Sequence, residues 1–156
     1  MSRFAEKSHL VSKSNNSPSD NTLMQAIVGV IEDYKHQKSI RSIPLKLFSN
    51  RKLGVLEVIV KYLKENQNLP YNEIASLLNR DDRTIWTSYN KAIKKHKDKF
   101  SQNNTDTIDI SIFHDRKQAP LQALVNHLKE KGMSYKKIAE ALNRSYKTIW
   151  ITNKRK

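Results

Sequence analysis

Apolar residues recur along this chain at the spacing of amphipathic helices, and the same pattern occurs twice. The first copy opens on a helical face made of Tyr71, Ile74, Ala75 and Leu78. Asn79 then tolerates the left-handed conformation that ends helices, and the Asp81 carboxylate is suited to cap a new helix. In that helix, over 82–92, the residues predicted to pack back on the first are Ile85, Tyr89 and Ala92. The pattern predicts two short helices joined by a tight turn.

The second copy keeps this frame 64 residues later, as in Tyr71 and Tyr135. Ser134 is predicted to cap its first helix, and Ser145 replaces Asp81 as the cap of a second helix over 146–155. Upstream of each copy lie an extended segment, 43–48 or 108–113, and a further amphipathic helix. We therefore expect an all-α protein with two tandem trihelical helix-turn-helix modules and an extra N-terminal helix.

The same pattern sets the predicted boundaries. A polar tail over 1–21 is expected to be disordered, and residues 22–42 hold the N-terminal helix, with Thr22 as its cap, and a linker. The first module covers 43–99, a polar linker covers 100–107, and the second module covers 108–156. The leading helix of the first module is expected to be capped by Ser49 or Asn50 and to run to about residue 66. The N-terminal helix carries an apolar stripe that either packs on the first module or pairs residues 22–38 of two chains in a homodimer.

Charge narrows the choice of partner. The 29 Lys and Arg outnumber the 15 Asp and Glu and give a net charge of +14, which favours a polyanion such as DNA, RNA or an acidic membrane surface. The absence of Cys excludes disulfides and zinc fingers. No apolar run approaches the ~18 residues of a membrane span, and the start lacks the apolar core of a signal peptide. We expect a cytoplasmic, nucleoid-associated protein with no membrane partner.

The second helix of each module is the candidate recognition helix. Its outward residues in the first module are predicted to be Arg83, Thr84, Trp86, Thr87, Ser88, Asn90 and Lys91. In the second module they are Tyr146, Lys147, Thr148, Trp150, Ile151, Thr152, Lys154 and Arg155. Such short, polar and basic faces suit base edges and phosphates in a major groove, where an Arg holds guanine in a bidentate way.

Two pairs of residues beside these faces carry narrower expectations. Arg80 and Arg144, in the turns, are expected to contact phosphates. Trp86 and Trp150 follow the inward Ile by one position, about 100° round the helix. Each Trp either packs on the flank of its module or faces the groove.

The segment from Pro70 to Ala75, continued by Arg83, Thr84 and Ile85, resembles the helix-turn-helix of sigma-factor region four, the domain that reads a promoter element. The second copy resembles it equally. The likeness covers about 24 residues per module, and it implies DNA binding. No part of the chain resembles the other sigma regions, and neither the Trp residues nor the tandem arrangement is typical of sigma factors.

No motif supports catalysis, and we expect neither an enzyme nor a cofactor. The five His lie at positions without metal-ligand spacing, and the three Gly are too separated to cradle a nucleotide. We expect a double-stranded DNA-binding protein, either a transcriptional regulator or an architectural binder of repeated DNA. Its tandem modules predict a direct-repeat-like site with half-sites about one turn, ~10 bp, apart. The alternatives are an adaptor for RNA polymerase or another protein, and an RNA-binding protein.

Overall fold

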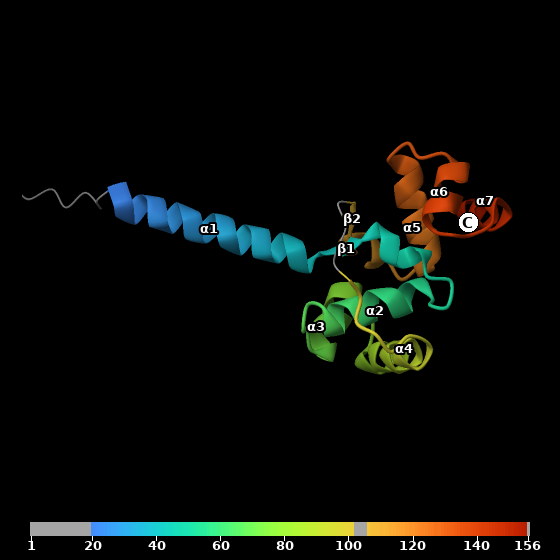
Figure 1. The fold of residues 1–156 in the computed structure, drawn as a ribbon, viewed down its shortest axis with the longest axis horizontal. Coiled ribbons are helices and arrows are strands. Elements are labelled where there is room, and N and C mark those ends of the chain that lie inside the picture. Colours follow the sequence, from blue (N-terminus) through green and yellow to red (C-terminus); the bar gives the residue numbers. More distant parts are fainter. Residues whose placement is uncertain (1–19, 102–105, 156) are drawn as a thin grey trace, which may run out of the picture. The chain divides into compact units, whose positions relative to one another are not determined.

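The computed structural model describes residues 20–101 and 106–155 and divides the chain into two compact units, 1–36 and 37–156 (Figure 1). The first unit contains most of helix α1 (Asp20–Ile40). Thr22, the predicted cap, is the third residue of this helix, and the predicted disordered tail lies outside the described residues up to residue 19. The apolar stripe of α1 is exposed at Leu23, Met24, Ile27, Val28, Val30, Ile31 and Tyr34. The homodimer through residues 22–38 stays a prediction.

The second unit contains the same order of elements twice, as the repeat predicts. The first module has strand β1 (Ser42–Pro44), 3-10 helix η1 (Leu45–Ser49) and helices α2 (Val55–Glu65), α3 (Tyr71–Leu78) and α4 (Asp82–Lys95). The second has strand β2 (Thr107–Asp109), 3-10 helix η2 (Ile110–Phe113) and helices α5 (Pro120–Glu130), α6 (Tyr135–Ala141) and α7 (Tyr146–Lys154). The protein is all-α apart from one small two-stranded sheet in its described part, which confirms the predicted class.

Three local predictions were wrong. Only the first residues of 43–48 and 108–113 are extended, because a 3-10 turn follows each strand; the Asp109 side chain caps the second turn at the N–H of Ser111 (2.8 Å). Helix α2 begins at Val55, where the Glu57 carboxylate accepts the Gly54 N–H at 3.0 Å. Phe100, assigned to the linker, is buried and stacks on His96 with 5.3 Å between ring centroids.

Each module has a core formed by the inner faces of its three helices. In the first module the fully buried side chains include Ile59, Leu63, Ile74, Leu78 and Ile85. In the second they include Leu124, Val125, Ile138, Leu142 and Ile149. These are the apolar positions at helical spacing. Burying each of these side chains stabilises the fold by about 1.5–3 kcal/mol, because its apolar surface is removed from water. The cores hold α4 and α7 against the two helices that precede each of them.

Polar residues differ between the two cores. In the first module the fully buried Lys61 ammonium lies 2.6 Å from both carboxylate oxygens of Glu65, and Tyr89 donates to the same carboxylate at 3.2 Å. In the second module the corresponding space is held by neutral groups. Asn153 donates to Asn126 at 2.8 Å and accepts from the Tyr135 hydroxyl at 2.7 Å. One module therefore depends on a buried charge pair and the other on amide hydrogen bonds.

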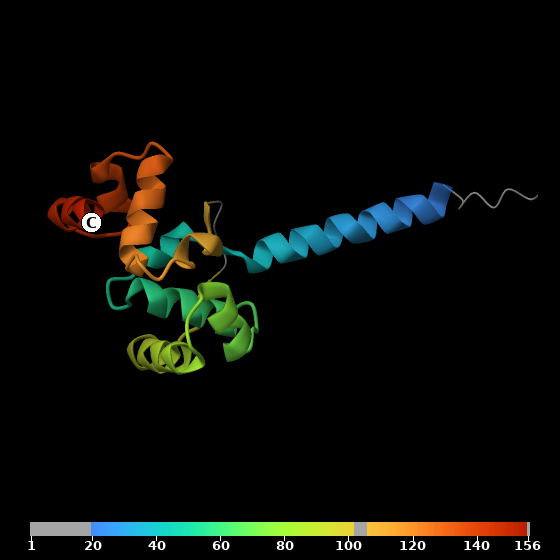
Figure 2. The same cartoon turned by 180° about the vertical axis from the view of Figure 1, so that it is seen from behind.

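The modules pack together through the sheet. Strands β1 and β2 are antiparallel, with Ile43 opposite Ile108 and both side chains buried. Beside them Phe48 and Phe113 face each other with 6.0 Å between ring centroids. Both views show α2 and α5 between the two outer helices α4 and α7 (Figures 1 and 2). The repeat therefore forms one compact unit, with both candidate recognition helices on its outside.

Candidate nucleic-acid interface

The turn between the last two helices is built the same way in each module. Asn79 and Asn143 both adopt the left-handed conformation, with φ of 50°. Asp81 then accepts the backbone N–H of Thr84 at 2.9 Å, and Ser145 accepts that of Thr148 at 3.1 Å. Both caps were predicted from the sequence, and both are confirmed. They satisfy donors at the helix start that have no partner within the helix.

The two caps differ in charge. The pKa of the Asp81 carboxyl lies below its usual range, mainly because the backbone N–H and the hydroxyl of Thr84 donate to it, with a smaller contribution from the nearby Arg116. Hydrogen bonds to the ionised form favour it, so Asp81 is negative at neutral pH. Ser145 places no charge at the start of α7. The first module therefore carries an anion where the second carries a neutral hydroxyl.

Most of the predicted outward residues are exposed. On α4 these are Arg83, Trp86 and Lys91. On α7, or directly after it in the case of the last, they are Tyr146, Lys147, Thr148, Trp150, Ile151, Lys154 and Arg155. Trp86 is 55% exposed and Trp150 45%, so about half of each side chain is open to solvent. Contact of either ring with DNA stays a prediction.

Ser88 and Thr152 were wrongly placed on the outer faces. Each is only 8% exposed, and the Ser88 hydroxyl donates to the Thr84 carbonyl at 2.8 Å. Each lies one helical turn after a fully buried Ile and so shares its inward face. Other predicted contacts are partly engaged within the helices. The hydroxyls of Thr84 and Thr148 bond the caps, Thr87 and Asn90 are half-buried, and the Asn90 amide donates to the Trp86 carbonyl.

Arg80 and Arg144 occupy equivalent places in the two turns. Both side chains are half-buried, and the buried Nε atom of each has no protein hydrogen-bond partner. Leaving a buried donor unsatisfied costs free energy, so both guanidinium groups have unmet donor capacity beside the candidate recognition helices. Their expected contact with phosphate stays a prediction.

Two further basic residues were missed by the sequence reasoning. Arg51 lines a shallow hollow with Asn143, Arg144 and Ser145 of the other module, and Arg116 lies near Asp81 of the first. Both side chains are exposed. A signal was present, because the Arg-Lys pairs at 51–52 and 116–117 match at the offset of 65 that relates the strands. The sequence did not show that each of these Arg residues lies near the turn of the opposite module.

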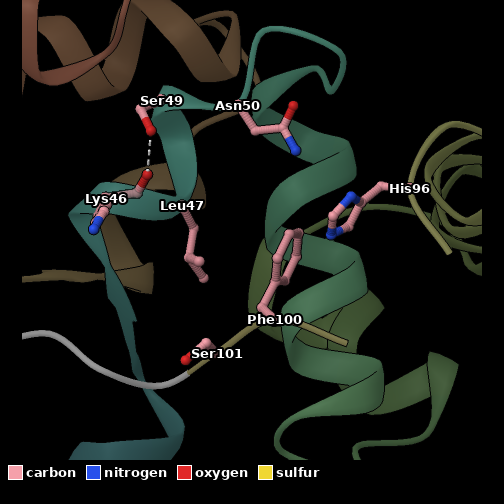
Figure 3. Close-up of a pocket in the computed structure, with 7 residues that line it drawn as sticks. All are labelled: Lys46, Leu47, Ser49, Asn50, His96, Phe100 and Ser101. Atoms are coloured by element: carbon pink, nitrogen blue, oxygen red, sulfur yellow. Dashed lines mark hydrogen bonds between the residues drawn. The ribbon is translucent and has the colours of Figure 1, made fainter. Parts of the chain in front are cut away.

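The described residues offer little else that resembles a site. A pocket of about 310 Å³ lies between η1 and the segment after α4, lined by Lys46, Leu47, Ser49, Asn50, His96, Phe100 and Ser101 (Figure 3). Most of its surface is apolar, and its hydrogen-bonded pair, Ser49 to the Lys46 carbonyl, stabilises η1 itself. No group of His, Asp or Glu in the described part of the chain could hold a metal ion. No helix there is long and apolar enough to cross a membrane.

Comparison with known proteins gives no relative for this chain. No family model, curated protein or solved structure matches it. The features that bear on function are the side chains of the two outer helices and of the turns before them.

Proposed function

We propose that this protein binds double-stranded DNA by inserting α4 and α7 into successive major grooves, as helix-turn-helix proteins do. The observation that carries the proposal is the matched pair of outer faces. In both modules a left-handed Asn, a capped helix start and an exposed Arg or Lys recur in the same order, and an exposed Trp follows three residues later. An α-helix with such residues near its start fits the width of the B-form major groove. The protein acts as a transcriptional regulator or an architectural DNA binder.

Electrostatics supports the same partner. The net charge of +14 attracts a polyanion over several ångströms, and neutralised phosphates release counterions. The exposed and half-buried cations around the two candidate recognition helices support this partner. Arg83 and Lys147 face outward near the helix starts, and Arg80, Arg144, Arg51 and Arg116 surround the turns. In this arrangement Arg83 would read a base, whereas Lys147 and the Arg residues around the turns would contact phosphates and position the protein on the DNA backbone.

The proposal is tested by binding of the full chain to a pool of random duplexes, and to the same pool as single strands, at ~150 mM salt. Replacing Arg83 by Ala should weaken duplex binding about tenfold and relax one position of the enriched sequence, because a bidentate guanine contact is lost. Replacing Lys147 by Ala should weaken binding to all sequences and make the salt dependence less steep, because a phosphate contact is lost.

The control for both variants is Lys131→Ala, which removes one exposed cation at the end of α5 and should leave affinity nearly unchanged. Preference for single strands or hairpins would replace the proposal with RNA binding. Absence of any nucleic-acid binding would bring forward the adaptor that contacts RNA polymerase. In that case Arg83 and Lys147 would be silent in every assay of partner capture.

The charge at the first cap gives a separate prediction. Replacing Asp81 by Ser keeps a capping oxygen, as Ser145 does in the second module, and removes an anion from the proposed DNA face. Duplex affinity should rise on the order of threefold at low salt, with little gain at high salt, because exposed charges are screened. Thermal unfolding of both proteins checks that the helix start is preserved. Unchanged affinity at low salt would mean that Asp81 lies away from the phosphates.

A further inference from the structure

The two modules pair through equivalent residues, which a simple head-to-tail arrangement does not produce. Ile43 and Ile108 occupy the same position in the repeat, 65 residues apart, and they lie opposite each other in the antiparallel sheet. The flanking pairs are Ser42 with Asp109 and Pro44 with Thr107. When each residue is replaced by its equivalent in the other module, the pair Ser42–Asp109 becomes the pair Thr107–Pro44. The sheet is therefore centred on an approximate two-fold axis through the Ile43–Ile108 pair.

Hydrogen bonds and ring contacts around the sheet obey the same exchange. The Leu45 N–H donates to the Asp106 carbonyl at 2.9 Å, and the Ile110 N–H donates to the Arg41 carbonyl at 2.7 Å. Adding 65 to Leu45 and Arg41 gives Ile110 and Asp106, so each bond is the image of the other. Phe48 and Phe113 are also equivalents, and they contact each other across the axis.

Packing farther from the axis is reciprocal as well. The 3-10 helix η2 packs on α3, where His114 Nδ1 lies 3.2 Å from the Leu77 carbonyl, and η1 packs on α6. Arg51 of the first module lies beside Ser145, and Arg116, its equivalent, lies near Asp81. The symmetry thus extends from the sheet to the starts of α4 and α7. The two recognition helices are related by rotation about one axis and not by translation along the chain.

The symmetry of a DNA site mirrors the symmetry of the protein that binds it. We propose that the target element is an inverted repeat with two unlike halves, bound by one chain as a built-in pseudo-dimer. This inference rests on the proposed DNA binding and replaces the direct-repeat-like site expected from the order of the modules. That expectation assumed that consecutive modules face the same way, whereas the antiparallel sheet turns one against the other.

The halves are unlike because the outer faces differ at equivalent positions. The differing pairs match Asp82, Arg83, Thr87, Asn90 and Lys91 of α4 with Tyr146, Lys147, Ile151 and Lys154 of α7 and with Arg155, which follows α7. Arg83 is suited to bidentate recognition of guanine, whereas Ile151 offers an apolar contact to a thymine methyl group. The flanking Trp and Thr are the same in both helices. One half-site therefore differs from the other at a few bases while the symmetric frame is retained.

A symmetrised protein tests the orientation directly. In the full chain, Tyr146→Asp, Lys147→Arg, Ile151→Thr, Lys154→Asn and Arg155→Lys give α7 and the residue after it the outer face of α4 without touching buried positions. Sequences are then selected from random duplexes with this variant and with the wild type. The variant should enrich one block twice in inverted orientation, and bind that element about tenfold or more tightly than the same blocks as a direct repeat. The wild type should enrich this block once, beside a second block.

A reciprocal variant guards against misfolding of the first. Asp82→Tyr, Arg83→Lys, Thr87→Ile, Asn90→Lys and Lys91→Arg give α4 the outer face of α7 and should double the other block, again inverted. Circular dichroism of both variants checks the fold. Enrichment of direct repeats would overturn the inference while leaving the proposed DNA binding intact, and so would enrichment of a single block or of none among retained duplexes. Retention of no duplex by the wild type would overturn both.

Discussion

Replacing Phe113 by Ala is expected to lower the free energy of unfolding by about 4 kcal/mol, the usual cost of truncating a buried aromatic side chain. Phe113 is 1% exposed and contacts Phe48 of the other module, so the substitution leaves a cavity where the modules meet. This loss is a large fraction of the 5–15 kcal/mol by which domains are typically stable. Urea unfolding followed by circular dichroism measures it. A change below about 1 kcal/mol would contradict the packing of the ring at this site.

The contact between the two rings is isolated by a double-mutant cycle. Phe48→Leu and Phe113→Leu are better suited than Ala here, because two Ala substitutions would remove most of the stability of the protein. The coupling free energy should be about 1 kcal/mol, as expected for an aromatic pair beyond its buried area. Strictly additive effects would mean that the two modules do not meet through these rings. The cycle therefore also tests the two-fold axis on which the proposed inverted site depends.

Local features of this fold were predictable because their causes lie within a few residues. Asn79 and Asn143 end helices through their own tolerance of positive φ, and Asp81 and Ser145 cap helices through backbone donors three residues away. The apolar faces followed in the same way from helical spacing. Ser88 was wrongly placed on the outer face because its residue type is polar. A small polar residue can nevertheless lie among the apolar residues of the inward face, as Ser88 does.

The relation between the modules was not predictable in the same way. The match between 43–48 and 108–113 was visible, but repeat alignment shows only that two segments are equivalent. Whether equivalent segments pair with each other depends on contacts between residues far apart in the chain. The positions of Arg51 and Arg116 beside the opposite turns depend on the same contacts. Most of the outer residues could therefore be read from the sequence, but the orientation of the two candidate recognition helices relative to each other could not.

Replacing Glu65 by Ala is expected to destabilise the protein by about 3 kcal/mol. The Lys61 ammonium is fully buried and bonded to both carboxylate oxygens of Glu65, so the substitution leaves a buried cation without its counter-charge. Tyr89 loses its acceptor at the same time. The expected value lies at the low end for buried pairs, because the Glu65 side chain is 18% exposed and water reaches it. Urea unfolding at neutral pH measures the change.

The repeat supplies the matched control. Glu130 occupies the position of Glu65 in the second module but is exposed, and Asn126 stands where Lys61 would be. Glu130→Ala should therefore change stability by less than about 0.5 kcal/mol. Adding Lys61→Met to Glu65→Ala should recover much of the loss, because the uncompensated charge is then removed and an apolar side chain of similar length fills its place. Failure of that rescue would place the cost in the Tyr89 hydrogen bond or in packing, and not in the unpaired ammonium.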